Sequence, residues 1–198
     1  MSLESNPARR VVTDPLALRA LAHPLRLKIW GLVGREGRLT AADAARQLGI
    51  SQALASHHLR QLAKYGYVER GSAGDNRERP WQVTATSHRF AGDNSAEGWE
   101  AVEFLDRYLA EQAVTQLADW QERRADEDPA WSEHSGVSQS LLYLTVAELA
   151  ELGQAWRDLT YEYARRRPLG DASSRGPGVV PVNLTLVKAP LRPTPSGG

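Results

Sequence analysis

A run of small and polar residues at helical spacing is the part of this sequence best suited to contact another molecule. The apolar positions of residues 51–65 recur as on the buried side of a helix; they are Leu54, Ala55, Leu59 and Leu62. The opposite side then carries hydroxyl, amide, imidazole and guanidinium groups, which can form hydrogen bonds with base edges in the major groove. The candidate contact residues are Ser51, Gln52, Ala53, Ser56, His57 and Arg60.

Two helices joined by a short turn are predicted to position these residues. Thr40 is a typical helix N-cap, and Asp43 three positions later favours a capping box. The helix is expected to end at Leu48, because Gly49 readily adopts the left-handed conformation found after a helix. Ser51 then caps the next helix, which runs to about residue 65. A short helix, a turn with glycine and a longer helix form a helix-turn-helix.

Two further helices are predicted before this motif. Asp14 followed by Pro15 is typical of an N-cap and the first helical position. This short helix should stop at His23, because a residue before proline avoids the α region. A second helix is expected over about residues 25–35, with Gly34 and Gly37 at its end.

A β-hairpin is predicted directly after the helix-turn-helix. Residues 67–70 favour a strand, residues 71–77 have the composition of a turn, and residues 80–84 favour the returning strand. Arg77 and Arg79 lie near the tip of this hairpin. A hairpin in this position is called a wing, and its guanidinium groups can bind a phosphate or enter the minor groove.

The charge distribution also indicates a polyanionic partner. The whole chain is neutral, but residues 1–90 carry 14 Lys and Arg against 7 Asp and Glu. Residues 91–167 have the opposite balance, with 7 against 16. A basic first half suits nucleic acid, and the acidic part that follows would confine the contact to that half.

Composition and motifs argue against several classes of protein. The chain has no cysteine, so it can form no disulfide, thiolate nucleophile or cysteine-ligated metal centre. It has no phosphate-binding glycine loop and no nucleophile elbow, so we expect neither enzymatic activity, catalytic residues nor a cofactor. No apolar run approaches the roughly 20 residues of a membrane span, and the N-terminus lacks a signal-peptide core. We expect a cytoplasmic protein that does not contact a membrane.

Residues of about 14–86 resemble the winged helix-turn-helix domain of the ArsR family of bacterial repressors. The resemblance is carried by LRALAHPLRLKIWGLV (18–33), TAADAARQLGISQALASHHLRQLAKYGYVER (40–70) and RERPWQVT (77–84). It covers a little over a third of the chain. It implies a homodimer that binds a double-stranded DNA operator, usually represses, and releases DNA when an effector arrives. It also implies recognition-helix contacts by Ser51, Gln52, Ala53, Ser56, His57 and Arg60, and wing contacts by Arg77 and Arg79.

The chain departs from the metal-sensing members of this family. Those members place cysteines at the start of the helix before the recognition helix, where this sequence has Leu39-Thr40-Ala41-Ala42. Others place histidine with Asp or Glu on the helix after the wing. Here that helix has no histidine, and its acidic residues include Glu100, Glu103, Asp106 and Glu111. We therefore expect no metal site, and an effector that is a small molecule or a partner protein.

The second half of the chain is predicted to contain two helices and two strands. Residues 95–124 favour one long helix with an apolar stripe that suits packing against a partner chain; the stripe is Trp99, Val102, Leu105, Leu109, Ala113, Leu117 and Trp120. Thr145 and Glu148 form a capping box for a helix that Pro168 ends. Strands are expected at 140–144 and 179–189, where Val182, Leu184 and Leu186 alternate.

The predicted fold class is mainly α with small β. It comprises an N-terminal winged helix-turn-helix and a C-terminal α+β dimerisation and regulatory region with a long helix. The expected parts are a flexible N-terminus (1–13), a DNA-binding domain (14–90), a dimerisation and effector region (95–189) and a flexible tail (190–198).

Aromatic residues of the second half leave two interpretations open. They can line an apolar ligand pocket, or they can belong to the hydrophobic core and dimer interface. The residues are Trp99, Trp120, Trp131, Tyr143, Trp156 and Tyr161.

Two functions remain open for the whole chain. The first is a dimeric transcriptional regulator that binds specific DNA and responds to an effector. The second is a winged-helix module for protein interaction without a specific DNA target, whose binding surface is the acidic half. The polar side of residues 51–65 and the wing arginines favour DNA, because an interaction module would present apolar groups there.

Overall fold

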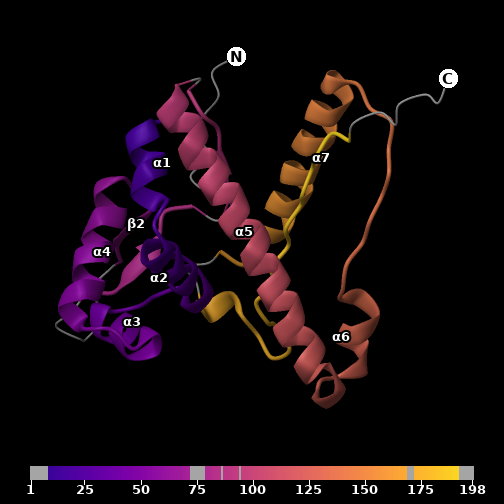
Figure 1. Cartoon of the computed structure of the whole chain (residues 1–198). Coiled ribbons are helices and arrows are strands. Elements are labelled where there is room, and N and C mark those ends of the chain that lie inside the picture. The colour runs from indigo at the N-terminus through magenta and orange to yellow at the C-terminus, as the bar shows by residue number, and fades with distance from the viewer. Residues whose placement is uncertain (1–8, 72–78, 86, 94, 169–171, 192–198) are drawn as a thin grey trace. The chain divides into compact units, whose positions relative to one another are not determined.

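The computed structural model describes residues 9–71, 79–85, 87–93, 95–168 and 172–191. The chain is mainly helical (Figure 1). It divides into two units, Met1–Leu105 with Ser140–Pro181, and Asp106–Gln139 with Val182–Gly198. Among the helices of the described residues, none has both the length and the apolar character needed to cross a membrane.

Four helices form the N-terminal part and lie together at the indigo and purple end of the chain in Figure 1. They are α1 (Pro15–Leu21), α2 (Pro24–Glu36), α3 (Ala41–Leu48) and α4 (Gln52–Lys64). Helix α4 packs against the other three. Their apolar faces form one core that contains the fully buried Leu18, Leu21, Ile29, Leu59 and Leu62. The four predicted helices are confirmed.

The helix ends are set by the residues that the sequence indicates. The Asp14 side chain accepts a hydrogen bond from the Leu16 amide, 2.9 Å away. Thr40 and Asp43 form the predicted capping box, in which the Thr40 Oγ1 and the Asp43 amide nitrogen lie 3.1 Å apart. Gly49 has φ +65°, the left-handed conformation in which a side chain would be strained. Local capping chemistry therefore explains where these helices begin and end.

The predicted hairpin is present as strands β2 (Val68–Arg70) and β3 (Trp81–Val83), which pair antiparallel with Arg70 opposite Trp81. The backbones of Trp81 and Leu39 also exchange two hydrogen bonds, with N–O distances of 2.8 and 3.0 Å. The wing stem is thereby attached to the segment that precedes α3.

A second pair of strands was not predicted. Strand β1 (Arg9–Val12) pairs in parallel with β4 (Ser87–Phe90). The Arg10 guanidinium donates hydrogen bonds to the carbonyl oxygens of Tyr65 and Gly66 at the end of α4, each at 2.5 Å. The expectation of a flexible segment over 1–13 is therefore wrong for residues 9–12, because strand pairing and these hydrogen bonds hold them in place.

Helix α5 (Ala96–Arg123) confirms the predicted long helix. Its buried residues are Gly98, Ala101, Val102 and Leu105, all in the first part of the helix. Leu105, which was predicted to face a partner chain, is fully buried within this chain. Val102 and Leu105 of the predicted apolar stripe of α5 therefore belong to the core of this chain, and only the other residues of the stripe remain free to pack against a partner chain.

The C-terminal part contains α6 (Pro129–His134) and α7 (Val146–Ala164) with short 3₁₀ turns at Arg124–Asp126 and Ala172–Ser174. Helix α7 begins at the predicted Thr145–Glu148 capping box. Helix α6 was missed although Asp128-Pro129 repeats the Asp-Pro signal that begins α1.

The two strands predicted in this part are not formed. Residues 140–144 and 179–189 have no strand partner within the described part of the chain. The fold class, mainly α with small β, is confirmed, but the two strands expected in this region are wrong, and the region is helical where it is regular. An alternating sequence favours a strand, but a strand forms only when another strand supplies its backbone hydrogen bonds.

Candidate nucleic-acid interface

The first turns of α4 present most of the predicted contact residues to solvent. Ser51 caps the helix, with its Oγ 3.2 Å from the Leu54 amide nitrogen. None of the six predicted contact residues is buried. Ser56 is half-buried, and the exposed ones are Ser51, Gln52, Ala53, His57 and Arg60. They lie opposite the buried Ala55, Leu59 and Leu62. The sequence prediction of which residues face outward therefore agrees with their exposure.

Leu54 is the exception on this helix. The sequence analysis placed it on the buried side, but its side chain is 40% exposed. It lies in the first turn with Gln52 and Ala53 and adds an apolar group to the exposed surface. An apolar side chain in a recognition helix can contact the methyl group of thymine. Leu54 is therefore a further candidate contact that sequence periodicity assigned to the wrong side.

The wing is described only in part. Arg79 is exposed at the start of the returning chain, next to the β3 strand. Arg77, the second predicted wing contact, lies outside the described residues. The wing loop is closed at its base by a hydrogen bond from the Gly71 amide to the Pro80 carbonyl oxygen, with an N–O distance of 2.8 Å.

Arg70 is a wing residue that the sequence analysis missed. Its guanidinium carbon lies 3.9 Å from the centre of the Trp81 ring, and its Nη1 donates a hydrogen bond to the Arg79 carbonyl oxygen. Arg70 is itself exposed. It links the two strands beside Arg79, and a cation stacked on an aromatic ring loses little freedom when it binds an anion. The sequence offered one signal for this role: Arg70 ends the strand before the turn, and Trp81 begins the strand after it.

Three histidine rings lie close together at α4 and the start of α2. His58 is buried, and its ring centre lies 5.1 Å from that of His23 and 5.3 Å from that of His57. Burial lowers the pKa of His58, and the neighbouring charges of His23, His57 and Arg26 lower it further. His23 caps α2, since its Nδ1 accepts a hydrogen bond from the Leu25 amide. His58 thus packs against the α1–α2 junction, while His57 points to the exposed side.

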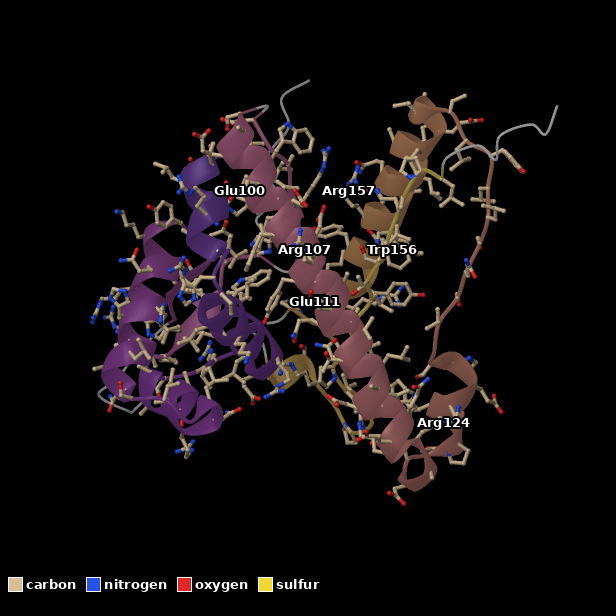
Figure 2. All side chains as sticks on the ribbon, viewed as in Figure 1. Glu100, Arg107, Glu111, Arg124, Trp156 and Arg157 are labelled. Atoms are coloured by element: carbon tan, nitrogen blue, oxygen red, sulfur yellow. The ribbon has the colours of Figure 1, made fainter. Side chains whose placement is uncertain are left out.

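The acidic residues of α5 do not assemble into a metal site. Figure 2 labels Glu100 and Glu111 on this helix. Among the residues that the structure describes, no group of three or more His, Cys, Asp or Glu side chains is arranged to hold a metal ion.

The six aromatic residues proposed for a ligand pocket come from several elements. Trp99 and Trp120 lie on α5, Trp131 on α6, Tyr143 before α7, and Trp156 and Tyr161 on α7, where Figure 2 labels Trp156. Tyr143 is 98% exposed and Trp99 is 57% exposed, which is too exposed for the lining of a closed pocket in a single chain. An open pocket of about 290 Å³ is instead lined by residues of β1 and α1, by Thr13 and Asp14 between them, and by Lys64 and Tyr65, and none of the six aromatic residues contributes to it.

Comparisons with known proteins agree with this geometry. Residues 21–70 match the family model described as a helix-turn-helix domain. The chain is also similar to the arsenic resistance transcriptional regulator ArsR1 of Pseudomonas putida, with 33% identity over 73 residues. This match covers 37% of the chain and 53% of the relative, so the chain spans about half the length of that protein. The family-model match includes α3, the turn after it and α4.

Proposed function

We propose that this protein, whose residues 21–70 match a helix-turn-helix domain, is a dimeric, sequence-specific, DNA-binding transcriptional repressor of the ArsR type. The observation that carries the proposal is the exposed polar surface at the start of α4, opposite a fully buried apolar side. A helix of this kind enters the major groove with its N-terminal residues at the base edges.

Within this proposal the residues divide into two kinds of contact. Gln52, Ser56 and Arg60 are proposed to bind base edges, because they are polar, lie on the side of α4 opposite its buried residues and can form hydrogen bonds. The exposed Arg70 and Arg79 of the wing are proposed to bind the phosphate backbone, and Arg77, which lies between them in the sequence, is proposed for the same contact. The basic balance of residues 1–90 supports the same partner.

A second copy of the chain is part of the proposal. Dimers place two recognition helices in successive major grooves of a two-fold symmetric operator. Helix α5 keeps Trp99, Phe104 and Val114 exposed, and large apolar side chains on one helix support packing against another chain.

The effector is proposed to be a small molecule or a partner protein. The relative from Pseudomonas putida is named for arsenic resistance. This chain contains no cysteine, so the thiolate ligands that a soft metalloid prefers cannot be formed here. The aromatic residues of α5, α6 and α7 remain the proposed ligand-binding residues of a dimer, in which the exposed ones would be covered.

Fluorescence anisotropy tests the proposal, with the duplex upstream of the protein's own gene compared with a random duplex at several salt concentrations. Gln52→Ala should cost roughly 1–3 kcal/mol on the specific duplex at one base position and leave random DNA almost unaffected. Arg79→Ala serves as the matched variant, because loss of a phosphate contact weakens binding to both duplexes and lowers the salt slope by about one.

Equal losses for Gln52→Ala on both duplexes would contradict its role in base recognition. Absence of binding to any duplex at low salt would contradict the regulator and favour the alternative, a winged-helix module for protein interaction. The exposed polar surface of α4 makes that alternative the weaker one, since protein interfaces depend on buried apolar anchors.

A further inference from the structure

The carboxyl end of α4 is bound by an arginine from outside the helix-turn-helix. Helix α4 ends at Lys64, and the carbonyl groups at the end of a helix have no partner within it. Arg10 of strand β1 supplies one: its Nη2 donates a hydrogen bond to the Tyr65 carbonyl oxygen, and its Nη1 donates one to that of Gly66. Hydrogen bonds from a charged donor are stronger than those between neutral groups. The end of α4 is therefore fixed to β1.

The surroundings of the Arg10 guanidinium suit this contact. Gly66 has φ +71°, and a β carbon at this position would lie only 3.3 Å from the Arg10 Nη1, so glycine permits the close approach. The guanidinium carbon also lies 4.7 Å from the centre of the Tyr67 ring. Tyr67 is fully buried, and its hydroxyl donates a hydrogen bond to the Ala17 carbonyl oxygen at 2.8 Å. A planar group that donates in two directions and stacks on a ring is a property of arginine and not of lysine.

Strand β1 is attached on its other side to the strand that precedes α5. It pairs in parallel with β4, and the Val12 carbonyl oxygen accepts a hydrogen bond from the Ala91 amide at 3.1 Å. The Val12 side chain is buried. Strand β1 therefore joins the end of α4 to β4. Residues 9–12 lie outside the match to the helix-turn-helix domain, which covers residues 21–70, so this attachment is an addition to the matched domain.

We infer that Arg10 is a positioning residue for DNA recognition, which fixes the direction of α4 so that the exposed side chains of its first turns meet the base edges. The 13 residues of α4 span about 20 Å, so a small tilt at the carboxyl end displaces the first turn. Hydrogen bonds to base edges weaken steeply with distance and angle. Arg10 acts through α4 and not on DNA, because its guanidinium is engaged with backbone carbonyl groups. The inference rests on the proposed function and names a residue that controls its specificity.

Fluorescence anisotropy of the full-length chain tests this role, with Arg10→Gln as the variant and Arg89→Gln as its matched control. Arg89 is exposed on β4, so both substitutions remove one positive charge from the same pair of strands. The probes are a duplex that the parent chain selects from a random-sequence pool and a random duplex. Arg10→Gln should lower the ratio of the two affinities about fivefold or more, and Arg89→Gln by less than about twofold. The salt slope of Arg10→Gln should equal that of the parent, because no phosphate contact is lost.

Two results of this experiment would overturn the inference. A purely structural role would lower the fraction of active protein, weaken binding to both duplexes alike and leave the ratio of affinities unchanged. Stoichiometric titration with the selected duplex measures that fraction. A salt slope lower by about one in Arg10→Gln would show that Arg10 contacts a phosphate itself.

Hydrogen exchange measures the attachment without DNA. At the end of α4, the Gly66 amide donates to the Ala63 carbonyl oxygen and the Tyr67 amide to that of Leu62. Both amides should exchange faster in Arg10→Gln than in the parent or in Arg89→Gln, because the end of the helix is no longer fixed. Unchanged exchange in Arg10→Gln would overturn the inference.

The selection step separates this inference from the proposed function. If the parent chain enriches no sequence from the pool, the proposed function is wrong and the role of Arg10 in recognition falls with it. If the parent enriches a sequence but Arg10→Gln keeps the parent's ratio of affinities, the inference alone is wrong.

Discussion

The two helices α4 and α7 begin in the same way but end in different environments. Each starts at a hydroxyl N-cap, Ser51 for α4 and Thr145 for α7, and each carries an apolar stripe. The stripe of α4 is buried at Ala55, Leu59 and Leu62. On α7, Leu152, Leu159 and Tyr163 are exposed, and Gly153 is its buried residue. Local sequence forms a helix in both places, but only neighbouring elements bury its apolar side.

The contrast extends beyond these two helices. Residues 9–105 contain the core of the N-terminal helices and the base of the wing. Between residues 106 and 191, Gly153 is the one buried residue of the described chain. The free energy of folding therefore comes from the first region, whereas the second depends on what its apolar residues contact in an assembly.

The largest difference in the free energy of unfolding is expected between truncation of a buried leucine and truncation of an exposed one. Leu62→Ala should lower the free energy of unfolding by about 2–5 kcal/mol, because it removes a fully buried side chain and leaves a cavity. Leu159→Ala, on the exposed side of α7, should change it by less than about 0.5 kcal/mol. Urea denaturation at low protein concentration measures both. Similar losses for the two variants would break the contrast between the regions.

The second-largest effect is expected in the pH dependence of stability, through the buried ring of His88. His88 packs against Trp30 and Phe90, and burial, assisted by the charge of Arg10, lowers its pKa to about 4. As the pH falls from about 6.5 to 4, the unfolded chain takes up a proton that the folded chain does not. The contribution of His88 to the free energy of unfolding should be fully present above about pH 6.5. Roughly 3 kcal/mol of it should be lost by pH 4.

His88→Phe keeps an aromatic ring but removes the titration. Urea denaturation of both proteins between pH 8 and pH 4 should therefore show a smaller loss of stability in the variant at acidic pH. An identical pH dependence would indicate that His88 takes up its proton in the folded state as readily as in the unfolded one.

Two matching capping boxes provide the smallest and most specific comparison. Thr40 with Asp43 begins α3, and Thr145 with Glu148 begins α7. Thr40→Ala should cost about 1 kcal/mol of global stability, because α3 belongs to the cooperative core. Helix α7 belongs to the same compact unit as the N-terminal helices, but its apolar side is exposed, so Thr145→Ala should reduce helix content by circular dichroism and shift the urea midpoint much less than Thr40→Ala does. A shift as large as that of Thr40→Ala would show that α7 unfolds together with the core.

The sequence predicted the exposed side of α4 well, because the relevant information is local. Ser51 and Gly49 set the turn, and periodicity assigned Gln52, His57 and Arg60 to the exposed side. It failed for Leu54, since residues at the edge of an apolar stripe are buried only where a neighbouring element covers them. Arg70 was missed because its contact with Trp81 depends on the register of two strands.

Non-local pairing explains the remaining differences. Val12 and Phe90 are strand partners, although 77 residues lie between them, and no local pattern announces that pairing. Residues 179–189 have a clear strand pattern but no partner strand in the described chain. A strand needs both a suitable sequence and a second backbone, and only the first of these is visible in one segment.

By itself, the sequence determined every helix except α6, the caps of those helices, the polar surface of α4 and the absence of thiolate chemistry, because these depend on side-chain type and on contacts a few residues apart. The tertiary structure decided which apolar faces are buried, how Arg10 binds the end of α4 and how Arg70 joins the wing strands. These features bring distant residues together, and their energy depends on packing and desolvation rather than on local preference.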